Sequence, residues 1–362
     1  MKKNFLFVMA AAAMLASCSK DAAVSEPAGT GNENGVVDPT NPNSPVKIVL
    51  GASTIDAGVE LDKKASRAPI DAWNNTVVGI YALADAGEDW STAVVNDPTM
   101  LWENVKGTIE SGTTDQAIIL ELNDQPGYYP NQGTNEYTFY GYYPYQEEAP
   151  TMEGKKVTTT YTITGEEDIL CGKAAVEDGY NASYFRTGEG ATPIITFNHM
   201  LTQLKFTVKK SESFDDGQQL SIQSITISDV PTQLDLVIAN GDDSSQSIAQ
   251  NADPMTTSLP VSNASFDITA NANSTTAENV GQPIMLFSDN AATNSFKAIV
   301  VLVDGAGKTS SNEITLNAPA PDNIYKQGSA YTVELTINSL QEITVKASLT
   351  AWANGGTISG TI

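Results

Sequence analysis

Apolar residues occupy every second position in Val333-Glu334-Leu335-Thr336-Ile337 and in Ile343-Thr344-Val345-Lys346-Ala347-Ser348-Leu349. Leu204, Phe206 and Val208 repeat the pattern in the middle of the chain. A period of two predicts strands with one buried and one exposed face. Since no segment shows sustained helical periodicity, the sequence predicts an all-β protein built from β-sandwiches.

Further strands are expected on both sides of these segments. Short apolar runs rich in β-branched residues occur at 77–83 and 117–122, and the first strand-like segment is 46–51. Residues 297–303 and 314–316 flank the sequence Asp304-Gly305-Ala306-Gly307-Lys308, which predicts a hairpin. The length favours about two domains at roughly 150 residues each. We place the boundary at Gly188–Pro193, giving an N-terminal sandwich at 46–190 and a C-terminal one at 191–362.

The N-terminus has the pattern of an export signal. Lys2 and Lys3 precede an apolar run that is shorter than the roughly 20 residues a membrane span needs, so residues 1–17 are predicted to be a signal peptide. Leu15-Ala16-Ser17-Cys18 resembles a bacterial lipobox, which implies that Cys18 is acylated and anchors the chain to the outer membrane. The alternative is an ordinary signal peptide with an incidental cysteine. Residues 18–45 are rich in Ser, Asn, Pro, Gly and Thr and are predicted to be a flexible spacer.

The composition argues against several functions. Acidic residues outnumber basic ones 43 to 19, a net charge of -24, which would repel nucleic acid. With Cys18 acylated, Cys171 is the only thiol, and it lies in an apolar run typical of a buried residue. His199 is the only histidine, so a catalytic triad or a zinc site would have to use it. We therefore expect no enzyme, cofactor or metal; calcium at the acidic clusters 85–89 and 242–243 is an alternative.

Aromatic residues are concentrated at 137–145. Their faces could stack on sugars, or they could be the core residues of one strand and its flanks, which is the interpretation we favour. The cluster consists of Tyr137, Phe139, Tyr140, Tyr142, Tyr143 and Tyr145.

Four features together resemble the fimbrillin family of Bacteroides-type bacteria, the subunits of surface fimbriae. The first is the lipobox with its spacer, and the second is the basic segment around Ser66-Arg67-Ala68 after one early strand. The third is Tyr140-Gly141-Tyr142-Tyr143-Pro144. The fourth is Asp168-Ile169-Leu170 followed by the segment 197–206, which begins Phe197-Asn198-His199-Met200.

The resemblance implies two tandem transthyretin-like β-sandwich domains and a lipid-anchored precursor at the outer membrane. An arginine-specific protease would cut between Arg67 and Ala68 and remove the first strand, with Val46, Ile48 and Leu50. A strand of another subunit would then fill the vacated groove. The donor would be the C-terminal segment 343–362, with apolar residues Ile343, Val345, Ala347, Leu349, Ile358 and Ile362.

The leading hypothesis is therefore a non-catalytic structural or adhesive fimbrial subunit. Its partners would be other fimbrial subunits in a homo- or hetero-polymer, and host or bacterial surface ligands are a further possibility. The alternative is a surface glycan-binding lipoprotein that uses the tyrosine cluster or Trp73, Trp90, Trp102 and Trp352. An extracellular hydrolase ranks third. Whether the subunit belongs to the stalk, tip or anchor of the fimbria stays open.

Overall fold

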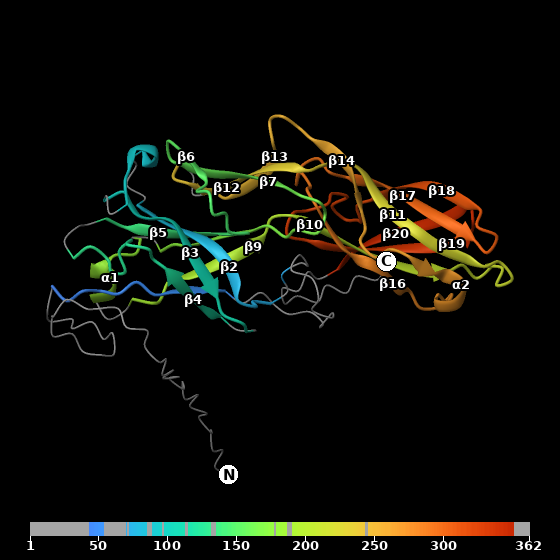
Figure 1. Ribbon diagram of the computed structural model, residues 1–362, viewed down its shortest axis with the longest axis horizontal. Helices are drawn as coiled ribbons and strands as arrows, with labels where there is room; N and C mark the ends of the chain where they lie inside the picture. The colour runs from blue at the N-terminus through green and yellow to red at the C-terminus, as the bar shows by residue number, and fades with distance from the viewer. Residues whose placement is uncertain are drawn as a thin grey trace, which may run out of the picture. The chain divides into compact units, whose positions relative to one another are not determined.

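The computed structural model describes residues 43–53, 70, 72–84, 89–95, 98–112, 115–131, 135–176, 179–186, 190–242 and 245–350, which belong to one compact unit (Figure 1). Cys18, Arg67, Ala68, Ile358 and Ile362 lie outside these residues, as does Trp352. Within the described part of the chain, no helix has the length and apolar character needed to cross a membrane.

The first sheet closes on itself. Its order is β1-β4-β3-β2-β5-β8-β9, and β1 closes the ring because it pairs antiparallel with β4 and parallel with β9. The strands are β1 (Leu50–Ala52), β2 (Thr76–Ala84), β3 (Met100–Ile109), β4 (Gln116–Glu121), β5 (Tyr137–Tyr143), β8 (Leu170–Ala174) and β9 (Ile194–His199). The 3-10 turn η1 (Trp90–Thr92) and the short helix α1 (Ala182–Arg186) lie in the connections.

A second sheet packs against β2, β5 and β8. Its order is β13-β12-β7-β6, with β6 (Thr151–Glu153), β7 (Lys156–Thr162), β12 (Gln233–Asn240) and β13 (Ser247–Gln250). The predicted boundary near 190 lies between β7 and β12, which pair from Gln233↔Thr162 to Asn240↔Lys156. The division into domains at 190 stays a prediction, and the pairing of the strands crosses it.

Strands β2 and β5 are buried on both faces. On one face, Ile80, Ala82 and Phe139 belong to the core enclosed by the first sheet. On the other, Tyr81 and Tyr142 belong to a second core that also contains residues of β7 and β12. Burial on both faces explains why these two strands read as continuous apolar or aromatic runs rather than as alternating patterns.

Glycine makes room for one of these rings. A Cβ built on Gly79 would lie 2.1 Å from Cε1 of Tyr142, its cross-strand partner. The Tyr142 ring therefore occupies space that any other residue at 79 would need.

The C-terminal strands form a sandwich of two further sheets. The first has the order β16-β10-β19-β20, with β10 (Thr202–Lys210), β16 (Glu278–Leu286), β19 (Ala330–Ser339) and β20 (Glu342–Thr350). The second has the order β14-β11-β17-β18, with β11 (Leu220–Pro231), β14 (Thr256–Pro260), β17 (Ser295–Asp304) and β18 (Thr309–Asn317). Strand β15 (Phe266–Asp267) pairs with β11 and leads into α2 (Ile268–Asn271).

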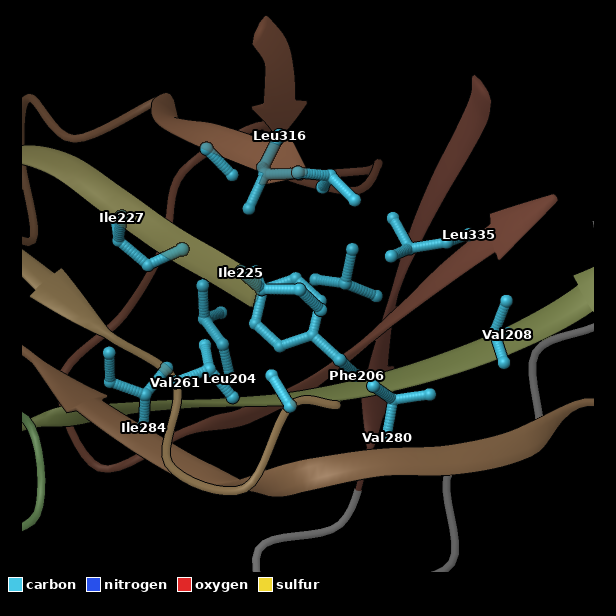
Figure 2. Packing of buried hydrophobic residues seen from close by; sticks show 14 of the residues in the cluster. Leu204, Phe206, Val208, Ile225, Ile227, Val261, Val280, Ile284, Leu316 and Leu335 are labelled. Carbon is cyan, nitrogen blue, oxygen red and sulfur yellow. The ribbon is translucent and has the colours of Figure 1, made fainter. Parts of the chain in front are cut away.

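The core of this sandwich is apolar and closely packed. Figure 2 shows Phe206 of β10 among Ile225, Leu335 and Val280, which come from different strands of the two sheets. Phe206 is 2% exposed and each of the other three 1% or less. The alternation predicted for 204–208 and 333–337 thus matches the buried face of β10 and β19.

The all-β β-sandwich class is confirmed, and the strands expected at 77–83, 117–122, 204–208, 333–337 and 343–349 are confirmed by β2, β4, β10, β19 and β20. The predicted hairpin is β17–β18. Its turn is stabilised because Asp304 Oδ1 accepts hydrogen bonds from the amides of Ala306 (2.9 Å) and Lys308 (2.8 Å), while Gly307 adopts a φ of 80°.

Replacing Phe206 by alanine should lower the free energy of unfolding by about 3–5 kcal/mol, because it leaves a cavity among side chains that cannot fully collapse. Chemical denaturation followed by far-UV circular dichroism measures the change. The control Lys297→Ala removes an exposed side chain of β17 and should stay within about 0.5 kcal/mol of the parent. Equal changes in the free energy of unfolding for the two substitutions would contradict the burial of Phe206 in this core.

Candidate functional site

The segment 46–53 is an extended piece of chain whose alternate side chains enter the core of the first sheet. Val46, Ile48 and Leu50 are 2%, 4% and 1% exposed, and Ala52 is fully buried. Val49, by contrast, is 51% exposed. This alternation is that of a strand with one buried face, and it includes the strand-like segment predicted at 46–51.

Hydrogen bonds hold the backbone of this segment on both sides. Near its start, the Ile48 amide donates to the Gly127 carbonyl (2.9 Å), and the Tyr129 amide donates to the Val46 carbonyl (2.9 Å). Near its end, the amides of Gly51 and Ser53 donate to carbonyls of residues 193 and 195, at 2.9 and 2.8 Å. The regular strand β1 is shorter than the predicted 46–51, because residues 46–49 bond mainly to the loop after β4 rather than to a strand.

Trp73 fastens the C-terminal end of the segment. Its indole N–H donates to the Ser53 carbonyl at 2.7 Å. Its ring packs edge-on against the ring of Phe197 of β9, with 5.4 Å between the ring centroids. The Ser53 hydroxyl accepts from the Phe197 amide at 3.2 Å. Trp73, which follows the segment in sequence, and Phe197 of β9 therefore both contact Ser53.

Arg186 fastens the N-terminal end. Its guanidinium donates to the Ser44 carbonyl (2.7 Å) and to the Asn131 side chain (2.9 Å). Neither this contact nor that of Trp73 was predicted from the sequence. No local pattern indicates them, because each joins residues that are far apart in the chain.

The geometry makes 46–53 an insert between two strand edges. Without it, β4 and β9 would each lose their pairing partner on this side, and the core would open to solvent where Val46, Ile48 and Leu50 now lie. Unpaired strand edges beside an apolar groove form a binding site for another extended strand.

The C-terminal residues of the described chain form an edge strand. β20 pairs antiparallel with β19 from Ala330↔Thr350 to Ser339↔Glu342 and ends its sheet. Ile343, Val345 and Ala347 are half-buried against the C-terminal core, and Leu349 is 45% exposed. No residue of β20 is as deeply buried as Val46, Ile48, Leu50 and Ala52 of segment 46–53.

The residues considered for chemistry have structural surroundings. Burial raises the pKa of the Cys171 thiol well above its ordinary value, so the group stays neutral, as expected for a buried cysteine. His199 is buried and its Nδ1 lies 2.9 Å from a carboxylate oxygen of Asp168. In the described part of the chain, no three His, Cys, Asp or Glu side chains gather as a metal site would require.

The aromatic residues considered for sugar binding lie in the cores. Trp73, Trp90 and Trp102 are at most 2% exposed, and their indole N–H groups donate to the carbonyls of residues 53, 84 and 126. In the cluster at 137–145, the rings of Tyr137, Phe139, Tyr140 and Tyr142 are buried, whereas Tyr143 and Tyr145 are partly exposed. The core interpretation is thus confirmed, with the difference that the rings fill two cores, one on each face of β5.

Comparisons with known proteins agree with this architecture. A family described as "Fimbrillin-like" matches residues 66–352. A solved structure of a candidate cell adhesion protein from Bacteroides uniformis is 18% identical, covers 84% of this chain and 98% of its own, and gives a TM-score of 0.53. One from Parabacteroides distasonis, also a candidate for cell adhesion, is 9% identical with 87% and 98% coverage and a TM-score of 0.52.

The tip fimbrial protein Mfa3 from Porphyromonas gingivalis, solved with a C-terminal truncation, is 8% identical, with 85% and 100% coverage and a TM-score of 0.42. A search among curated proteins finds no match.

Leu50→Ala should destabilise the uncleaved protein by about 2–5 kcal/mol, because it opens a cavity between β4 and β9. Val49→Ala, one residue away on the exposed face, should change the free energy of unfolding by about 0.5 kcal/mol or less. Denaturant unfolding of both variants tests whether 46–53 is part of the core. If Leu50→Ala is as harmless as Val49→Ala, the segment contributes little to the folded state.

Proposed function

Since this chain belongs to the fimbrillin-like family, we propose that it is a structural subunit of a cell-surface fimbria that polymerises by exchanging strands. The precursor would be exported with signal peptide 1–17 and anchored to the outer membrane through Cys18. Cleavage between Arg67 and Ala68 by an arginine-specific protease would release segment 46–53, and a strand of another subunit would replace it. The proposal assigns the subunit no catalysis.

The position of the insert supports this proposal. The segment 46–53 is separated from the chain that follows Ile70 by residues 54–69, which contain Arg67. A single cut there leaves the insert attached to the body by non-covalent contacts alone. Arg186, the other arginine, is engaged with Ser44 and Asn131 and should be a poorer protease substrate.

The sequence of the C-terminal strand resembles that of the insert. Val345-Lys346-Ala347-Ser348-Leu349-Thr350-Ala351 matches Val46-Lys47-Ile48-Val49-Leu50-Gly51-Ala52 at the valine, lysine, leucine and last alanine. This match is the observation that carries the proposal, because the shared apolar residues are those that the insert buries. The match also gives a register for the donor strand in the groove, in which Leu349 of one subunit takes the place of Leu50 in the next.

The burial of the two strands favours the exchange. In its own sheet β20 lies at an edge with Leu349 45% exposed, whereas the corresponding Leu50 is 1% exposed. Burying such a side chain stabilises by about 1.5–3 kcal/mol. This gain in burial free energy offsets part of the cost of breaking the pairing between β19 and β20. Ala347 is smaller than Ile48, so this register leaves unfilled space at one position.

Residues beyond β20 would extend the donor. Ile358 and Ile362 lie outside the described residues and stay predicted parts of the donor strand. Other fimbrial subunits are the proposed partners, and the cell-surface fimbrium is the proposed final location. The glycan-binding alternative loses support because its three described tryptophans are buried in the core.

Leu349→Asp should block assembly while leaving the subunit folded. Residue 349 is 45% exposed in its own sheet, but in the proposed register it enters a site where Leu50 is fully enclosed, and a buried unpaired charge is strongly unfavourable. After digestion with an arginine-specific protease, the oligomeric fraction measured by size-exclusion chromatography should fall about tenfold or more.

Ser348→Asp is the matched control. It adds the same charge one residue earlier, where both Ser348 and the corresponding Val49 face outward, so assembly should persist. In the reverse direction, Ala347→Ile should strengthen assembly by filling the space left at Ile48. If Leu349→Asp and Ser348→Asp assemble equally, the register is wrong; if the chain ending at residue 342 still assembles, β20 is not the donor.

A further inference from the structure

Two residues from separate sequence motifs meet in the interior. Asp168 lies just before β8, and His199 ends β9, where it pairs with Leu170. His199 Nδ1 lies 3.1 and 2.9 Å from the two carboxylate oxygens of Asp168. The side chains of Asp168 and His199 are only 1% and 3% exposed.

A third group completes the contact. The backbone N–H of Ile70 donates to Asp168 Oδ2 at 2.9 Å, across 98 positions of sequence. The Ile70 side chain is 8% exposed and belongs to the core of the first sheet. Asp168 therefore binds the chain at Ile70, the first residue that the structure describes after the insert.

We propose that Asp168 and His199 form an anchor that binds the chain at Ile70 and keeps the retained chain in place when the segment before it is removed. Release of that segment rests on the proposed function, whereas the anchoring contact does not. Asp168 is the binding residue, and His199 is a positioning residue that acts through it.

The chemistry of the three groups suits this role. An ionised carboxylate only accepts hydrogen bonds, so beside an ionised Asp168 the tautomer of His199 that fits is the one whose Nδ1–H donates a hydrogen bond to it. A buried carboxylate needs such donors, because without them it would pay the full penalty of leaving water. Loss of the Ile70 amide would remove one of its donors. The carboxylate therefore favours the conformation in which Ile70 stays bound.

The position of Ile70 in the sequence makes its amide special. In a chain cut after Arg67 the order would be Ala68-Pro69-Ile70, and proline has no N–H. The Ile70 amide is therefore the first backbone amide donor of the shortened chain. An acceptor at this site binds the first amide N–H of the shortened chain, two residues after its new end.

The anchor also lies on a wall of the groove. His199 ends β9, the strand that pairs with β1, and Phe197 on the same strand contacts Trp73. Holding Ile70 keeps Trp73, only three residues later, against Phe197 when Ser53 is absent. The groove between β4 and β9 thus keeps one formed end after the insert leaves.

The phenol of Tyr143 interacts electrostatically with Asp168. Burial, together with the negative charge of Asp168, raises the pKa of Tyr143, so this phenol stays neutral beside the carboxylate. Tyr143 lies on β5 and pairs with Leu170 of β8.

Hydrogen–deuterium exchange of the full, uncleaved chain tests the anchor at single-amide resolution. Asp168→Asn leaves one acceptor oxygen for two donors, so the Ile70 amide should exchange about tenfold faster or more. Glu148→Gln removes an exposed carboxylate elsewhere and should exchange like the parent. Amides of β11 and β17 should be unchanged in both variants.

Variants of His199 separate anchoring from general stability. His199→Asn keeps a donor N–H near the place of Nδ1 and should retain protection at Ile70. His199→Phe removes that donor and should lose the protection. If Asp168→Asn fails to fold, this pair still decides the matter.

Equal protection of Ile70 in the Asn and Phe variants of His199 would overturn the proposal, as would parent-like exchange in a folded Asp168→Asn variant. Because the measurement uses the uncleaved monomer, failure of cleavage or of strand exchange would not affect it. Failure of the anchor and failure of the proposed function are therefore distinguishable.

Discussion

The closure of the first sheet depends on a segment that is remote in sequence from the strands it joins. Residues 46–53 lie between β4 and β9, and they alone connect these two edges in the described part of the chain. Their backbone saturates hydrogen-bonding groups of both neighbours, while Val46, Ile48 and Leu50 fill the core below. A segment with this much burial cannot leave without a replacement, because exposed strand edges and apolar surface are both unfavourable in water.

The remaining strands of the first sheet belong to a body that is packed around two cores. β2 and β5 lie between two cores, and their aromatic side chains are packed on both faces. Trp73 contacts Phe197 of β9, and both residues also hydrogen-bond to Ser53 of the insert. His199, at the end of β9, contacts Asp168, which accepts from the Ile70 amide, and this contact involves no residue of the insert. One contact at β9 therefore does not depend on the segment that pairs with this strand.

The sequence predicts the class of fold because period-two patterns depend only on which face of a strand is buried. That argument succeeds for β10, β19 and β20, where one face meets the core. The period-two pattern is absent from β2 and β5, because both faces of these strands are buried, so the pattern does not predict them as strands. Strand order cannot be predicted in this way, because pairs such as β7 with β12 join segments that are more than 70 residues apart.

The same limit applies to the candidate site. The segment 46–51 is predicted to be a strand, and the resemblance to fimbrillins implies that it is removed, but neither indicates Trp73, Arg186 or Ile70 as its surroundings. Asp168 and His199 lie in two separate stretches of the segments that resemble fimbrillins. The sequence does not indicate their contact, because it depends on the antiparallel pairing of β8 with β9.

In the proposed assembly, 46–53 occupies a groove that a separate strand of matching sequence can fill. The most direct test is calorimetric titration of a peptide spanning residues 44–53 into a chain that begins at Ala68 and ends at residue 342. We expect saturable binding of one peptide per chain, and loss of binding when Ile48 and Leu50 of the peptide are replaced by aspartate. Absence of binding by the parent peptide, or equal binding by the aspartate peptide, would show that the groove does not accept a separate strand.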